Sequence, residues 1–120
     1  MKLRIHGNSI RLRLGRSDLA TLLERGAVEE RVGFPSGNSL RYRLERSTAP
    51  AAEAAFAGDA IVVRFPAQAI VAWADPAEVS MIAECAVAGC VLRLLVEKDY
   101  QCLAPRDDED DADLFPNPSA

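Results

Sequence analysis

The chain has 120 residues, of which 49% are hydrophobic and 27% charged, and this length and composition fit one soluble globular domain. No apolar run approaches the roughly 20 residues of a membrane span, and the opening MKLRIHGNSIRLRL lacks the continuous apolar stretch of a signal peptide, so we expect a cytoplasmic protein. The formal net charge of −4 comes from the acids of residues 107–113, and the rest of the chain is close to neutral. This balance disfavours nucleic acid as a partner but leaves anionic ligands open.

Residues 1–14 predict a β-hairpin, because apolar and basic residues alternate on both sides of a Gly-Asn turn. A helix follows. Ser17 is a favourable N-cap residue, residues 19–23 have the apolar spacing of a helix stripe, and Gly26 suits the C-terminal end.

Two further strands are expected around a turn cluster at residues 35–38, the second of them at residues 40–45. Residues 48–57 are rich in alanine. Pro50 suits the start of a short connecting helix there, with Phe56 packing inward.

The second half begins with a strand at residues 61–65, and Pro66 suits the start of a helix. Ile70 and Trp73 repeat the apolar helix stripe, and the helix is expected to end at Asp75-Pro76. Two strands close the half.

The three cysteines, Cys85, Cys90 and Cys102, form no CxxC pair, which disfavours a zinc site or a disulfide framework. In a two-residue hairpin at residues 88–89, Cys90 faces Val87 and Cys85 faces Leu92. This register separates the two sulfurs. We expect free thiols and no metal site.

Residues 10–46 and 61–98 follow the same pattern of strand, helix, strand, turn and strand. Arg13 aligns with Arg64 and Val28 with Val79 at an offset of 51, and Arg41 aligns with Arg93 at an offset of 52. The pattern indicates an internal repeat.

Together the elements predict an α+β fold with about seven strands and two helices, because single helices are interspersed among hairpins. The two β-α-β-β pseudo-repeats are expected to form a mainly antiparallel, barrel-like or open sheet with the helices packed on it. One domain would cover residues 1–105, and an acidic, proline-containing C-terminal tail would cover residues 106–120.

The first candidate site is a set of six arginines on predicted strands. Alternation places Arg11 with Arg13, and Arg41 with Arg43, on the side opposite the leucines, and Arg64 and Arg93 are their partners in the repeat. Arginine binds carboxylate or phosphate through two parallel hydrogen bonds. The alternative is a solvated sheet face on which Arg-Glu pairs cross between strands. The six residues are Arg11, Arg13, Arg41, Arg43, Arg64 and Arg93.

The second candidate is the acidic run at residues 106–113. Its spacing lacks the alternating ligands and central glycine of an EF-hand, so it is either a solvated tail or a segment that folds back onto the arginines, with Phe115 and Pro116 as anchors. The third is Cys102 near Glu97-Lys98-Asp99. No base is expected near Cys102, because the only histidine, His6, lies in the predicted hairpin turn.

The sequence contains no GxGxxG, P-loop, GxSxG or HExxH motif, and we expect no cofactor. Aromatic residues make up 6% of the chain and, Tyr42 apart, do not interleave with the arginines. Neither single-stranded nucleic acid nor a membrane is an expected partner.

The opening MKLRIHGNSIRLRL, the strand LRYRLE and the ending LRLLVEKDYQCLAPR with DLFPNP resemble a small, uncharacterised bacterial protein family of unknown function. The resemblance covers nearly the whole chain, is most specific at the start and at VEKDYQCL, and implies that the end of the chain belongs with the domain. A fainter similarity is to triphosphate-tunnel enzymes, but Lys2 and Arg4 stand where their alternating glutamates would be needed.

The leading functional hypothesis is a small binding or interaction module that contacts an anionic ligand or an acidic segment through an arginine-bearing sheet face. The alternative is an enzyme that acts on a phosphorylated small molecule in a barrel-like pocket. The alternative requires Arg11, Arg13, Arg41 and Arg43 to line one pocket together with a carboxylate. Whether the chain is an enzyme stays open.

Overall fold

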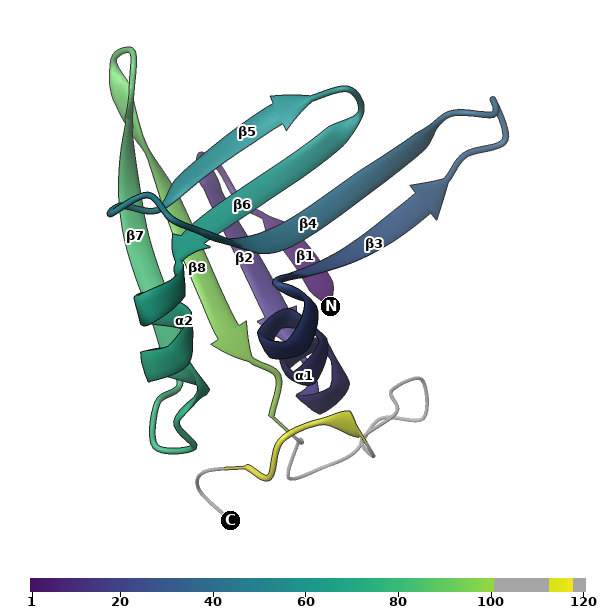
Figure 1. Cartoon of the computed structure of the whole chain (residues 1–120). Helices are drawn as coiled ribbons and strands as arrows, with labels where there is room; N and C mark the ends of the chain where they lie inside the picture. Colours follow the sequence, from purple (N-terminus) through teal and green to yellow (C-terminus); the bar gives the residue numbers. More distant parts are fainter. Residues whose placement is uncertain (101–112, 118–120) are drawn as a thin grey trace.

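The computed structural model of the protein describes residues 1–100 and 113–117. The described residues form eight strands and two helices (Figure 1). In chain order these are β1 (Lys2–Ile5), β2 (Ser9–Leu14), α1 (Arg16–Arg25), β3 (Ala27–Gly33), β4 (Ser39–Ser47), β5 (Glu53–Ala57), β6 (Ala60–Pro66), α2 (Ala67–Ala74), β7 (Ser80–Val87) and β8 (Cys90–Lys98).

The strands form two four-stranded sheets. Sheet A has the order β1-β2-β8-β7, and sheet B has the order β3-β4-β6-β5. Consecutive strands pair as antiparallel hairpins, and two parallel ladders, β2 with β8 and β4 with β6, join the hairpins. The predicted α+β class with mainly antiparallel strands is confirmed, but the described strands form two separate sheets and no closed barrel.

Each sheet combines one hairpin from each half of the chain. In sheet A, Arg11 lies opposite Leu95. In sheet B, Val62 lies opposite Arg43. Val62 corresponds to Arg11 at the offset of 51, and Leu95 corresponds to Arg43 at the offset of 52, so the two parallel ladders have the same register. This agreement supports the predicted repeat, which stays a prediction.

The strand pairing shows that Val28 does not correspond to Val79 when the two halves are aligned. Val28 pairs with Leu44, and Met81 pairs with Val96, so Met81 rather than Val79 corresponds to Val28. The reason is the length of the connection after the helix. Only Gly26 separates α1 from β3, whereas five residues separate α2 from β7.

A single hydrophobic core lies between the two sheets and the two helices. In Figure 1, α1 and α2 lie below sheet B and in front of the lower part of sheet A. The largest fully buried side chains come from both sheets and from α1: Leu12, Leu14, Leu22, Leu44, Leu94, Val63 and Val96. Neither helix of the described part of the chain is long and apolar enough to cross a membrane.

The start of α1 differs from the sequence prediction. Gly15, not Ser17, is the N-cap residue, and its backbone N–H donates to the carboxylate of Asp18 at 3.0 Å. Ser17 lies in the first turn, where both its backbone N–H and its hydroxyl donate to Asp113. A Cβ on residue 15 would come within 2.7 Å of the Asp113 carboxylate, so glycine permits this close approach.

The prediction of a helix between residues 50 and 57 was wrong. Residues 53–57 form β5, which pairs with β6 along its whole length, and Phe56 is 71% exposed instead of packing inward. Alanine favours a helix only weakly, and here the ladder with β6 decides the conformation.

Several other local predictions are confirmed. Gly26 ends α1 with a left-handed φ of 83°, and α2 begins after Pro66 and ends at Asp75. In the β7–β8 hairpin, Val87 pairs with Cys90 and Cys85 with Leu92. Both cysteines are free thiols.

Candidate functional site

The six predicted arginines divide into two groups on two different sheets. Because Leu12, Leu94 and Leu44 point into the core, the alternating residues of the same strands point outward. Arg11, Arg13 and Arg93 therefore share the outer face of sheet A, and Arg41, Arg43 and Arg64 share the outer face of sheet B. The structure does not bring all six together.

The arginines of sheet B are held by glutamates of the same face. Arg43 Nε lies 2.6 Å from Glu45, and Arg64 Nε lies 2.5 Å from the other oxygen of the same carboxylate. The hydrogen bond from Arg43 is the main cause that holds the pKa of Glu45 below its usual value, with Arg64 adding to it and burial opposing it. Arg41 lies 3.9 Å from Glu29 and donates to the Gly58 carbonyl.

The outer face of sheet A has fewer carboxylates for its cations. This face carries Lys2, Arg4, Arg11, Arg13 and Arg93 against two glutamates, Glu84 and Glu97. The outer face of sheet B carries four arginines against three glutamates: Arg31, Arg41, Arg43 and Arg64 against Glu29, Glu45 and Glu53. Asp99, after the end of β8, lies 2.9 Å from Lys2.

Two arginines of sheet A share one carboxylate. Arg13 lies 2.7 Å from Glu97, and Arg11 lies 3.6 Å from the same oxygen. Arg4 lies opposite Arg11 in the ladder and makes no ion pair with any residue that the structure describes. The guanidiniums of Arg11 and Arg4 therefore retain N–H donors that are available to bind an acceptor of a partner.

The β1–β2 turn carries His6 and is fastened to β8. Asn8 donates from its side chain to the Val91 carbonyl at 2.9 Å, and the Asn8 carbonyl accepts the Arg93 N–H at 3.1 Å. Ser9 donates from its hydroxyl to the His6 carbonyl at 2.6 Å. These contacts place His6 beside the arginines of β2 and β8.

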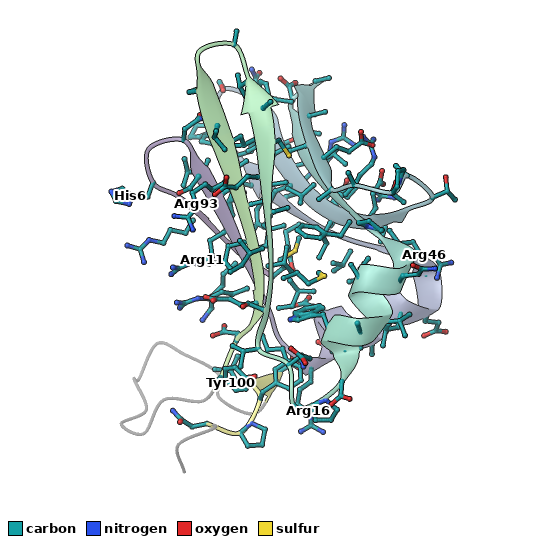
Figure 2. The ribbon with its side chains drawn as sticks, turned by 90° about the vertical axis from the view of Figure 1, so that its left-hand side faces the viewer. His6, Arg11, Arg16, Arg46, Arg93 and Tyr100 are labelled. Atoms are coloured by element: carbon teal, nitrogen blue, oxygen red, sulfur yellow. The ribbon has the colours of Figure 1, made fainter. Side chains whose placement is uncertain are left out.

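A pocket of about 230 Å³ lies at this place. Figure 2 shows His6, Arg11 and Arg93 projecting on the same side of the molecule, with Arg46 on the other side. The lining combines basic and apolar side chains and contains no carboxylate: His6, Ser9, Ile10, Arg11, Ile82, Arg93, Leu94 and Leu95. Two guanidiniums without a carboxylate between them suit an anionic group.

One row of residues across the outer face of sheet A has two charged side chains at one end and two apolar side chains at the other. Arg4, Arg11, Leu95 and Ile82 lie side by side on its four strands. The corresponding row of sheet B holds Glu29 opposite Arg43, followed by Val62 and Ala55. Like charges directly opposite one another destabilise a sheet, and Ile82 is 62% exposed, so this row of sheet A is costly for folding.

A larger groove of about 470 Å³ lies between α2 and β7 and is mainly apolar, with Trp73, Phe65 and Met81 in its lining. The corresponding place in the first half is filled by an ion-pair cluster. The N-terminal ammonium of Met1 is buried and lies 2.9 Å from Asp18 and 3.0 Å from Glu30.

Ala52, Ala69 and Ala83 stand in the second half where Met1, Asp18 and Glu30 stand in the first. Small side chains therefore leave this space open. Glu78 is the charged residue of the lining, so an anion is not expected there.

The cluster at Glu97-Lys98-Asp99 has a structural role. Lys98 is 3% exposed, and its ammonium donates to the carbonyls of Asp75 and Glu78 beyond the end of α2. Burial lowers the pKa of Lys98, and the charges of Asp75 and Glu78 partly offset this effect. Cys102, the other member of the predicted cluster, lies outside the described residues.

The acidic run at residues 106–112 also lies outside the described residues, and so does its predicted contact with the arginines. Beyond it, Asp113 contacts the start of α1, Leu114 is buried, and Phe115 donates its N–H to the Asp99 carbonyl at 2.9 Å. Pro116 is exposed. Residues 113–117 thus pack on the body of the domain.

Within residues 1–100 and 113–117, no group of three or more His, Cys, Asp or Glu side chains could hold a metal ion. Sequence reasoning missed His6, Leu95 and Ile82 as members of the site. The outward direction of Leu95 was readable from its alternation with Leu94, but the pairing of β2 with β8, which brings these residues to the arginines, has no local signal.

The protein is thus a small α+β domain in which each sheet combines a hairpin from each half of the chain, and sheet A carries a pocket lined by basic and apolar side chains. The chain belongs to a family of unknown function, DUF7009, whose model matches residues 1–119. No match was found among the curated proteins or among the solved structures.

Proposed function

We propose that the protein is a binding module that recognises an anionic partner through the outer face of sheet A. The observation that carries the proposal is the pocket lined by Arg11, Arg93 and His6, because the nearest carboxylates, Glu97 at 3.6 Å from Arg11 and Glu84 at 4.0 Å from Arg93, lie outside its lining. Arg4, which has no ion-pair partner among the described residues, lies next to Arg11 and extends the basic surface.

The geometry supports binding better than catalysis of phosphate chemistry. The enzyme alternative needs Arg11 and Arg13 in one pocket with Arg41 and Arg43, but these pairs lie on different sheets.

Two further aspects belong to the same proposal. The resemblance in sequence favours a bacterial protein, and a cytoplasmic location is part of the proposal. The correspondence of the ladders in the two halves favours an internal duplication.

The test measures binding of inorganic phosphate, citrate and a poly-glutamate peptide by calorimetry at low salt. The variant R4Q/R11Q removes two opposed arginines from sheet A, and the matched control R31Q/R41Q removes two opposed arginines from sheet B. We expect at least one anion to bind the wild type, and R4Q/R11Q to weaken it about tenfold or more, since hydrogen bonds to charged groups contribute roughly 1.5–3 kcal/mol.

Binding should also weaken with added salt, because the surface is exposed. Unchanged affinity in R4Q/R11Q, or an equal loss in R31Q/R41Q, would show that this face is not the site. The absence of any binding by the wild type would exclude the anion-binding function itself.

A further inference from the structure

We infer that the partner is an acidic and apolar segment of another protein, which lies on sheet A with carboxylates over the arginines and apolar side chains over Leu95 and Ile82. This inference rests on the proposed anion-binding function and specifies its partner. It starts from the four-residue row on the outer face, in which the basic pair and the apolar pair are direct neighbours.

The pocket is one part of a longer basic surface. It has a volume of about 230 Å³ and shares His6, Ser9 and Arg93 with a second pocket of about 500 Å³, which Glu84 also lines. A protein segment can place one carboxylate side chain in the smaller pocket and contact the rest of this surface.

The spacing of the row fits one secondary-structure element of a partner. Neighbouring strands lie about 4.8 Å apart, so the middle of the Arg4–Arg11 pair and the middle of the Leu95–Ile82 pair are separated by about 10 Å. This separation equals the diameter of an α-helix with its side chains, about 10–12 Å. A helix with an acidic stripe next to an apolar stripe can therefore contact both pairs at once.

The apolar half of the row has the exposure that such docking needs. Ile82 is 62% exposed and lines the same pocket as Arg11 and Arg93. Farther along the same face, Val91 is 46% exposed and pairs with Ala86. A strictly polar anion would leave this apolar surface in water, whereas an acidic and apolar segment would cover it.

The test compares designed helical peptides by fluorescence anisotropy. One peptide carries a glutamate stripe beside a leucine stripe, the second carries glutamate with serine in place of leucine, and the third carries lysine with leucine. The protein variants are Ile82→Ser and the control Val71→Ser. Val71 is a suitable control because it is 67% exposed on α2, close to the 62% of Ile82.

We expect the glutamate–leucine peptide to bind at least about tenfold more tightly than the glutamate–serine peptide, and the lysine–leucine peptide not to bind. Ile82→Ser should remove this advantage, and Val71→Ser should keep it. Circular dichroism confirms that both variants are folded.

Three outcomes would overturn the inference. Equal binding of the glutamate–leucine and glutamate–serine peptides would leave the anion-binding function standing and refute the apolar contact. Equal binding of the lysine–leucine peptide would refute recognition of charge. Binding to vesicles of anionic lipid without binding to any acidic peptide would identify a membrane surface as the partner instead.

Discussion

At the scale of single residues, the buried N-terminal ammonium is the least expected feature. Burial by itself would lower the pKa of the Met1 amine, but hydrogen bonds to Asp18 and Glu30 and their negative charges outweigh it and raise the pKa above its ordinary value of 8.0. Tyr42 donates its hydroxyl to the Met1 carbonyl at 3.0 Å and completes the cluster.

This cluster predicts a specific dependence of stability on pH. Because the amine has a higher pKa in the folded chain than in the unfolded chain, its contribution is fully present below pH 8.0 and is lost as the pH rises through the folded-state pKa. Urea unfolding of the wild type at increasing pH should show this loss.

Glu30→Gln should flatten this pH dependence. Burial raises the pKa of the Tyr42 hydroxyl above its ordinary value of 10.0, so the two proteins are compared at pH values below the Tyr42 transition. Equal slopes for the wild type and Glu30→Gln between neutral pH and the Tyr42 transition would contradict the proposed ion pair.

At the scale of elements, α1 depends on a residue from the far end of the chain. Asp113 accepts hydrogen bonds from the Ser17 N–H at 3.1 Å and from the Ser17 hydroxyl at 2.7 Å. Its negative charge also lies at the positive end of the helix. The segment at residues 113–117 therefore contributes to the stability of the first helix.

Asp113→Ala should destabilise the protein by about 0.5–2 kcal/mol, the usual cost of losing an N-terminal helix cap. Urea unfolding followed by circular dichroism measures the change. Asp113→Asn, which keeps an acceptor oxygen, should lose clearly less. If Asp113→Ala is as stable as the wild type, the contact does not hold α1.

The elements also show what local sequence could and could not predict. The turns at Gly26 and Gly89 and the faces of Leu12 and Arg11 followed from residue type and alternation. The strand at residues 53–57 did not, because five residues rich in alanine carry no strand signal and only the ladder with β6 specifies them. The cap of α1 was also unpredictable, since Asp113 is distant in sequence from Ser17.

At the scale of the whole molecule, the exchange of hairpins decides where the site lies. The alternation of residues along the strands was enough to predict arginines on an outward face. Which arginines lie together depends on the pairing of β2 with β8 and of β4 with β6. These long-range ladders leave three arginines among glutamates on sheet B and place Arg11 and Arg93 around a pocket with His6 on sheet A.

The most direct test of this account is an NMR titration of the isotope-labelled protein with a poly-glutamate peptide. The account predicts that the amide shifts that change most belong to β1, β2 and β8, with a maximum around His6, Arg11 and Arg93, and that they fade as salt is added. Changes centred on β3, β4 and β6, or no change at all at low salt, would contradict an anion-binding face on sheet A.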